Sequence, residues 1–170
     1  TFTGAKTDRT DDAQPLTGEE QAYFNSAFFT GEDVHLRAQF LTSLYDRPED
    51  IDLYQLLYNG IGEEINDEDL TALKAHGCSL EVDEEKLSTA GIDAFLQQNT
   101  GTSLAESNKR GLDQFLYLEE QDAYYHLHGD TNAPTDIFFS YGEREGNLIK
   151  LYYDASGQFL EGDFAQGWAC

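Results

Sequence analysis

The spacing of apolar residues changes once along this 170-residue chain, near residue 112. Before that point apolar side chains recur every three or four residues between capping residues, which is typical of amphipathic helices. After it they alternate with polar side chains, which is typical of strands. Helices followed by antiparallel strands predict an α+β fold with the helices on one sheet face. We therefore expect a single domain over residues 16–170, helical at about 16–111 and a sheet at about 112–170.

The helical part is expected to contain about six short helices, each bounded by a cap or a helix stop. Thr17 with Glu20 and Ser103 with Glu106 have the form of capping boxes, and Pro48 suits the first position of a helix. Residues 1–15 show no periodicity and are interpreted as a flexible tether. The helices are expected at 17–31, 34–45, 48–60, 66–77, 89–101 and 103–111.

The sheet part is expected to be a meander of three or four antiparallel strands. Alternation predicts strands at 123–128, 137–141 and 148–153, and a fourth at 158–160. The connections at 142–147 and 154–157 are polar and rich in glycine, as in tight turns between neighbouring strands.

The charge of the chain excludes some classes of partner. Ten Lys and Arg residues oppose 33 Asp and Glu residues, a net charge of −23. A nucleic-acid binder needs a basic face, and an anionic membrane surface attracts basic segments, so neither is an expected partner. No apolar run approaches the roughly 20 residues of a membrane span, so we expect no membrane insertion of the domain. The acid concentrates in the first half, where residues 1–85 carry a net charge of −15.

His126, His128 and Asp130 are a candidate metal site. Side chains two residues apart on a strand point the same way, and two imidazoles with a carboxylate suit Zn²⁺ or another divalent ion. This run resembles part of the metallo-β-lactamase ligand motif, but Thr131 stands where that motif has another histidine. The alternative is that the imidazoles lie on a half-exposed strand face and that the following residues form a turn.

Other site motifs are weak or missing. The acidic runs do not have the register of an EF-hand loop, and Asp83–Glu85 is interpreted as a solvated turn. Neither GxSxG nor SxxK occurs, so the sequence provides no nucleophile motif. Cys78 and Cys170 are the only cysteines; they either form a disulfide or are two small buried side chains.

The predicted sheet is rich in tyrosine and phenylalanine. If Tyr124, Phe138 and Tyr152 lie on an exposed sheet face, they form an aromatic platform for a protein, peptide or glycan partner. Tyrosine is also a common strand residue, so the same pattern fits a purely structural sheet.

Three segments carry a resemblance to known proteins: LYDRPEDIDLYQLLYNG (44–60), YLEEQDAYYHLHGDTN (117–132) and GEREGNLIKLYYD (142–154). They resemble a group of secreted or lipid-anchored proteins of gut clostridia. The resemblance implies an extracellular or cell-envelope location, with a removed N-terminal signal that in some members bears a lipid anchor. It covers about residues 40–155 and includes no catalytic motif, so it assigns no functional residue.

These observations favour a non-enzymatic extracellular domain that binds a partner through its aromatic sheet face. One alternative is a metal-dependent hydrolase that uses His126, His128 and Asp130. Another is an acidic decoy that occupies a cationic protein through the helical half, with an on-rate raised by electrostatic attraction.

Overall fold

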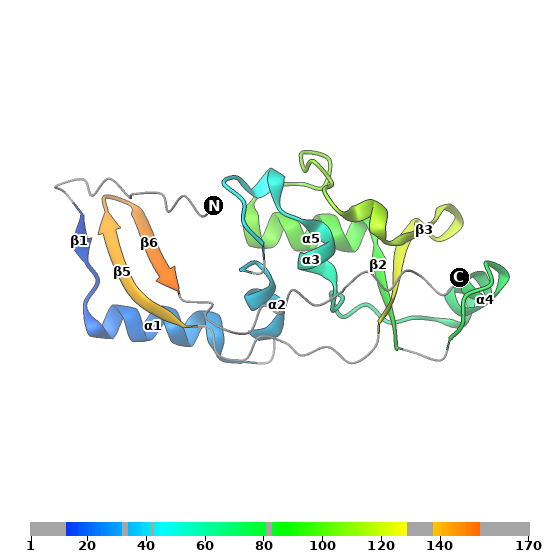
Figure 1. Cartoon of the computed structure of the whole chain (residues 1–170), viewed down its shortest axis with the longest axis horizontal. Coiled ribbons are helices and arrows are strands. Elements are labelled where there is room, and N and C mark those ends of the chain that lie inside the picture. Colours follow the sequence, from blue (N-terminus) through cyan, green and yellow to red (C-terminus); the bar gives the residue numbers. More distant parts are fainter. Residues whose placement is uncertain (1–12, 32–33, 42, 81–82, 129–137, 154–170) are drawn as a thin grey trace, which may run out of the picture.

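The computed structural model describes residues 13–31, 34–41, 43–80, 83–128 and 138–153. Within them the fold is α+β, with five α-helices and two three-stranded antiparallel sheets (Figure 1). The helices are α1 (Gly18–Phe29), α2 (Val34–Gln39), α3 (Leu53–Leu57), α4 (Asp67–Ala75) and α5 (Thr89–Thr100). The strands are β1 (Gln14–Pro15), β2 (Asp83–Ser88), β3 (Leu116–Leu118), β4 (Ala123–His128), β5 (Phe139–Glu145) and β6 (Leu148–Tyr153).

The strands divide into two sheets at opposite ends of the described structure. One sheet has the order β1-β5-β6 and packs with α1; we call these four elements, with Phe138 directly before β5, the hairpin unit. The other has the order β2-β4-β3 and packs with α3, α4 and α5; we call these six elements the core unit. Figure 1 shows α2 between the two units.

The sheet of the core unit is covered on both faces. Strand β4 is central and pairs with β2 along its whole length and with β3 over three residues. On one face a buried cluster joins this sheet to α3 and α5; on the other a smaller cluster joins it to α4. The larger cluster includes Leu53, Leu56, Leu57, Leu87, Ile92, Leu96 and Phe115. The smaller cluster consists of Leu73, Cys78, Leu118, Ala123 and Tyr125.

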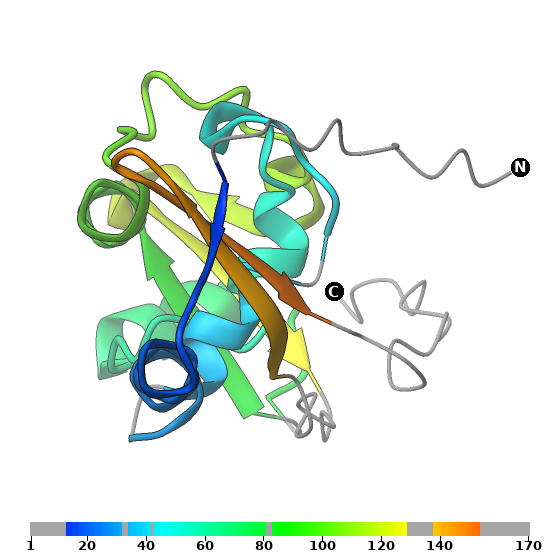
Figure 2. The ribbon, with the colours of Figure 1, turned by 90° about the vertical axis from the view of Figure 1, so that its left-hand side faces the viewer.

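The hairpin unit is a thinner assembly. A two-residue loop, Gly146–Asn147, joins β5 to β6, and Gly146 has the positive φ of 59° that such a tight turn requires. Helix α1 lies to one side of the three strands, as the view along the helix in Figure 2 shows. Neither buried cluster extends into this unit.

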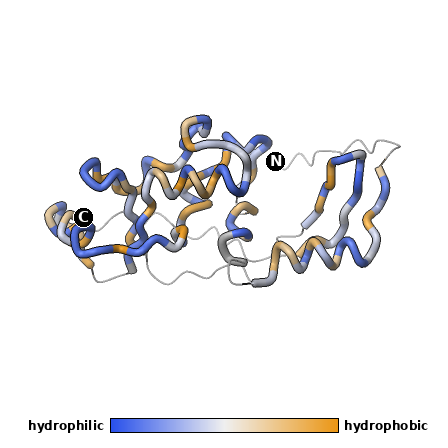
Figure 3. The backbone as a smooth tube through the Cα atoms, turned by 180° about the vertical axis from the view of Figure 1, so that it is seen from behind, coloured by the Kyte–Doolittle hydropathy of each residue, from blue (hydrophilic) through white to orange (hydrophobic). Residues whose placement is uncertain are grey.

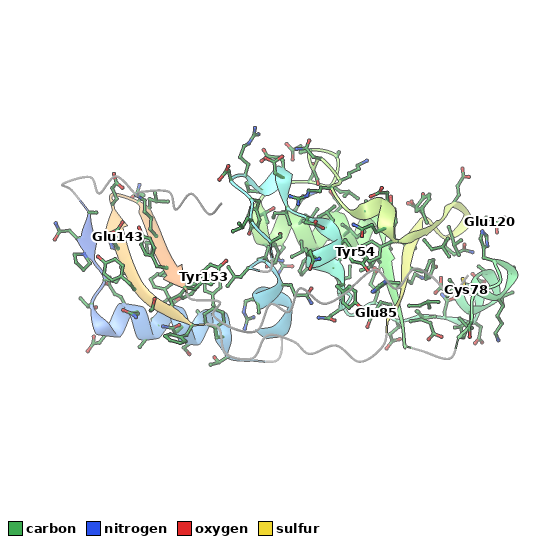
Figure 4. The ribbon with its side chains drawn as sticks, in the orientation of Figure 1. Tyr54, Cys78, Glu85, Glu120, Glu143 and Tyr153 are labelled. Carbon is green, nitrogen blue, oxygen red and sulfur yellow. The ribbon has the colours of Figure 1, made fainter. Side chains whose placement is uncertain are left out.

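Helix α2 and the residues after it connect the two units. The Arg37 guanidinium donates to the carbonyl oxygens of Phe28 and Thr30 at the end of α1. The Tyr153 hydroxyl, at the end of β6, donates to the Leu41 carbonyl oxygen at 3.3 Å. Figure 4 places Tyr153 at the end of the hairpin unit nearest α2. Among the described helices, none combines the length and the apolar character that crossing a bilayer requires.

Several sequence expectations are confirmed. The capping box of Thr17 and Glu20 opens α1, and Asn66 caps α4 through the backbone N–H groups of Glu68 and Asp69. The strand at 123–128 and the hairpin that follows also form as predicted, although the hairpin loop is shorter than expected.

The predictions of a sixth helix and of a single meander were wrong. Ser103 and Glu106 make the hydrogen bonds of a capping box, but only one turn follows, because Lys109 adopts a left-handed backbone with φ of 54°. The predicted third helix is interrupted: a 3₁₀ turn at Pro48–Asp50 precedes α3. Strand β4 belongs to a different sheet from β5 and β6, so no single meander forms.

Strands β1, β2 and β3 were not predicted. Asp83–Glu85, interpreted as a solvated turn, begins β2, and the last two residues of the predicted tether form β1. The strand expected at 158–160 and residues 1–12 lie outside the described residues.

Candidate binding surface

The structure separates the three aromatic residues predicted to form a platform. Tyr124 lies on β4, half-buried against the α3–α5 cluster, with its ring 4.7 Å from that of Tyr117. Phe138 directly precedes β5, and Tyr152 lies on β6. Phe138 and Tyr152 are therefore both in the hairpin unit, whereas Tyr124 belongs to the core unit.

His126, the first predicted metal ligand, is buried in an aromatic environment. Its ring centroid lies 4.5 Å from that of Tyr58, 5.3 Å from that of Phe115 and 5.6 Å from that of Tyr54. The side chain of His128 and the whole of Asp130 lie outside the described part of the chain. Among the residues that are described, no group of three His, Cys, Asp or Glu side chains has the geometry to hold a metal ion.

One face of the hairpin sheet carries two tyrosines around a carboxylate. Arg144 reaches Glu20 of α1 at 2.9 Å, so the side chains that alternate with it, Tyr141 and Glu143, point to the face away from α1. The Tyr152 hydroxyl donates to Glu143 Oε1 at 2.9 Å, and the Tyr141 and Tyr152 ring centroids are 5.6 Å apart. The hydrogen bond to Glu143 raises the pKa of Tyr152, so Tyr152 is a neutral donor at physiological pH.

Helix α1 forms the second aromatic part of the hairpin unit. It carries Tyr23, Phe24, Phe28 and Phe29, yet no residue of the helix is buried. Phe28 and Phe29 contact the ring of Phe139, with centroids 5.3 and 4.9 Å away, and Tyr23 makes an edge contact with Phe24. In Figure 3 hydrophobic positions follow α1 at this end of the molecule.

Exposure of large apolar side chains concentrates on the hairpin unit. Tyr23 is 67 % exposed, Phe138 56 %, Leu148 55 % and Phe28 38 %. The other exposed large apolar residues among those described are Leu44 and Tyr117. We call Tyr23, Phe28, Phe138 and Leu148 the aromatic surface of the hairpin unit, since three of the four side chains are aromatic. These residues lie on two sides of α1 and at both ends of the β5–β6 hairpin, so they offer several apolar contact points on one small unit.

Hydrogen bonds to the backbone hold α1 in place against β5. The Asn25 side chain accepts from the Phe139 N–H at 2.7 Å and donates to the Phe139 carbonyl oxygen at 3.1 Å. Gln21 donates to the same carbonyl oxygen at 2.9 Å. Because these bonds fix the helix without burying its aromatic side chains, the aromatic surface is displayed on a defined framework.

Sequence reasoning identified the aromatic residues of the sheet but missed those of α1 as surface residues. Tyr23 and Phe28 are five positions apart, which places them about 140° apart around a helix of 3.6 residues per turn. A single packing layer does not bury both positions. This angle is the signal in the sequence that α1 has more apolar surface than one sheet covers.

The chain matches no protein-family model, and comparisons with curated proteins and with solved structures found no similar protein.

Proposed function

We propose that this chain is a binding domain that attaches to a partner protein through the aromatic surface of its hairpin unit. The observation that carries the proposal is the gathering of exposed apolar side chains on one small unit whose helix has no buried residue. Interfaces are enriched in aromatic residues, and a few such side chains carry most of the binding free energy. Phe138 and Tyr152, predicted from sequence as ligand-binding residues, both belong to this unit.

The partner is cationic. The whole chain has a net charge of −23, and both cations of the hairpin unit are already in ion pairs, Arg144 with Glu20 and Lys150 with Glu145. A field of this sign attracts basic proteins and raises their association rate at low ionic strength. Charge therefore selects the class of partner, and the aromatic side chains provide the contact.

We also propose that the domain works in an oxidising location, outside the cytoplasm. Cys78 is buried and disulfide-bonded, and the only other cysteine of the sequence, Cys170, lies outside the described residues. Disulfides persist mainly in secreted and cell-surface proteins. An extracellular location also agrees with the resemblance noted in the sequence.

A titration with a basic model peptide tests the binding surface. The probe is a blocked octapeptide of four Lys-Val repeats, and binding is measured by calorimetry at low salt for the wild type, Tyr23→Ala and Phe138→Ala. Loss of a contact residue that contributes more than about 1.4 kcal/mol weakens binding at least about tenfold. We expect this loss for both variants.

The control is Tyr117→Ala, which removes a tyrosine of comparable exposure from β3 of the core unit. We expect this variant to bind the peptide as the wild type does. Equal affinity of all three variants and the wild type would refute a role of the aromatic surface and leave only diffuse attraction by charge.

A further inference from the structure

Strand β6 forms the outer edge of the hairpin sheet. It pairs with β5 over its whole length, and among the described strands none pairs with its other side. On the far side of β5, β1 pairs with only Arg144 and Glu143. In the core unit, by contrast, the outer strand β2 has a bridge between Lys86 and Glu63, and β3 has only three residues.

The backbone groups that this edge presents follow from the hairpin register. The pair Glu145 and Leu148 closes the two-residue loop, and in an antiparallel ladder alternate pairs turn their N–H and C=O groups towards each other. Leu148, Lys150 and Tyr152 therefore face β5. Ile149, Leu151 and Tyr153 present their N–H and C=O groups at the outer edge.

The edge lacks the features that normally prevent strand addition. Exposed edges are usually blocked by charged side chains, proline or a bulge. In β6 the one charged residue, Lys150, is ion-paired with Glu145 at 2.9 Å, and the strand has no proline. The bulge of this sheet lies in β5, between Phe139 and Tyr141.

We propose that β6 accepts an extended segment of a cationic protein, which adds to the hairpin sheet as a further strand. Main-chain hydrogen bonds supply affinity in this mode of recognition, and alternate side chains of the added strand supply specificity. This inference rests on the proposed function and names how the partner binds. A second copy of this chain is the less favourable occupant, because two molecules of net charge −23 repel each other.

The aromatic side chains of β6 flank the added strand on its two sides. Tyr152 and Glu143 lie on the face away from α1, whereas Tyr153 lies on the α1 side, where its hydroxyl bonds to Leu41. On the face away from α1, alternate side chains of the segment lie beside Tyr152, whose hydroxyl donates to the buried Glu143. The preference for a basic segment comes from the net charge of the chain.

The test removes one outward amide while keeping the hairpin. In Ile149→Pro the N–H at the outer edge is lost, and proline is tolerated at an edge position whose N–H faces away from the sheet. In the matched variant Ile149→Ala the side chain is shortened but the amide remains. Circular dichroism and the exchange protection of the Lys150 and Tyr152 amides show that each variant keeps its hairpin.

The Lys-Val octapeptide is titrated into both variants, beside a version with a central proline and a Glu-Val version. We expect Ile149→Pro to bind at least about tenfold more weakly than the wild type and Ile149→Ala to bind within about threefold. In the wild type the peptide should slow hydrogen exchange at Ile149, Leu151 and Tyr153. The proline-containing and acidic peptides should bind weakly.

Four outcomes would overturn the inference. The first is equal binding by Ile149→Pro and the wild type. The second is equal binding of the Lys-Val peptide and its proline-containing version. The third is protection of the three outward amides before peptide is added, which would mean that the chain itself covers the edge. The fourth is a dimer in sedimentation that Ile149→Pro dissociates, which would make the occupant a second copy.

The same titration separates this inference from the proposed function. If Tyr23→Ala and Phe138→Ala weaken binding but Ile149→Pro does not, binding through the aromatic surface is supported and binding by strand addition is refuted. If none of the three variants weakens binding, both proposals fail.

Discussion

Asp69 is a carboxylate that is almost completely removed from water, with 1 % of the residue exposed. The Tyr125 hydroxyl donates to Oδ1, while Lys86 Nζ, at 2.9 Å, and the Asn66 backbone N–H, at 3.0 Å, donate to Oδ2. Burial alone would raise the pKa of Asp69, but these three donors together outweigh it and lower the pKa. The network ties α4 to β2 and β4 on one face of the core sheet.

Replacing Asp69 by Asn should destabilise the protein strongly, because it leaves the largely buried Lys86 ammonium without its counter-charge. Breaking such a pair from one side typically costs about 3–5 kcal/mol, whereas Tyr125→Phe, which removes one hydrogen bond to a charged group, should cost about 1.5–3 kcal/mol. Urea unfolding at neutral pH measures both. If Asp69→Asn lowers the free energy of unfolding by less than Tyr125→Phe does, the ion pair between Asp69 and Lys86 contributes little to stability.

The Asp69 carboxylate should also make the free energy of unfolding depend on pH in the acidic range. Its pKa is lower in the folded than in the unfolded state, where Asp titrates near pH 4, so its contribution is complete above about pH 5. The contribution is lost as the pH falls through the folded-state pKa. The free energy of unfolding of the wild type should therefore fall more steeply than that of Asp69→Asn as the pH is lowered below about 5. Parallel curves would show that Asp69 does not titrate differently in the two states.

Gly111 shows how backbone conformation and lack of space combine at one residue. Its φ is +78°, and a Cβ atom there would lie 2.6 Å from Asp52 Oδ1 and 3.0 Å from the Tyr54 backbone nitrogen. Gly101 has a similar φ of +74° but open space around the same position. Gly101→Ala should therefore cost only the left-handed strain of about 1 kcal/mol, and Gly111→Ala clearly more, as measured by thermal unfolding. Equal costs would show that Asp52 and Tyr54 move aside freely.

At the scale of elements, β2 shows why the sequence predicted the helices better than the sheets. Its residues DEEKLS carry four charges and one large apolar side chain, so local propensity predicts a turn. The strand forms because β4 pairs with it along its length, and because the Glu63 carboxylate accepts from the Ser88 N–H and hydroxyl. These contacts are remote in sequence, and no local pattern encodes them.

The division into two sheets was hidden from the sequence for the same reason. Strands β4 and β5 both show the expected alternation, but alternation does not say which strands pair. The covered faces of the core sheet also decide where Tyr124 and His126 lie, since both side chains point towards the α3–α5 cluster. Capping residues and helix stops, which are local signals, placed α1 and α4 correctly and α5 to within one residue, since Ser88 rather than Thr89 is its N-cap.

Because α1 has no buried residue, its attachment to β5 should depend on Asn25. Asn25→Ala removes the two bonds to the Phe139 backbone and leaves that N–H without its side-chain acceptor. We expect faster hydrogen exchange throughout α1 and β5, with little change in the core unit, because local opening follows cooperative units. Asn99→Ala is the control, since the Asn99 side chain donates within α5, to the Phe95 carbonyl oxygen. Uniform acceleration in both units would contradict independent opening of the hairpin unit.

For the molecule as a whole, charge acts differently on binding and on stability. Ion pairs among the described residues, such as Arg144 with Glu20 and Lys150 with Glu145, are attractive and short-ranged. The net charge of −23 adds a longer-ranged repulsion that acts against the compact state. Salt screens the long-range repulsion most strongly, so it should strengthen folding while it weakens the binding of a cationic partner.

The melting temperature should therefore rise by a few degrees between low and high sodium chloride, by about 2–4 °C for a change of 1 kcal/mol in a chain of this size. Glu120→Lys provides the matched test, since this exposed carboxylate lies at the end of the core unit shown in Figure 4. The variant removes part of the repulsion, so its melting temperature should exceed that of the wild type at low salt, and the difference should shrink at high salt. Glu120→Gln, which changes the charge by half as much, should give about half the effect if charge alone is responsible. A melting temperature that falls with salt would show instead that the local ion pairs contribute more to stability than the net repulsion removes.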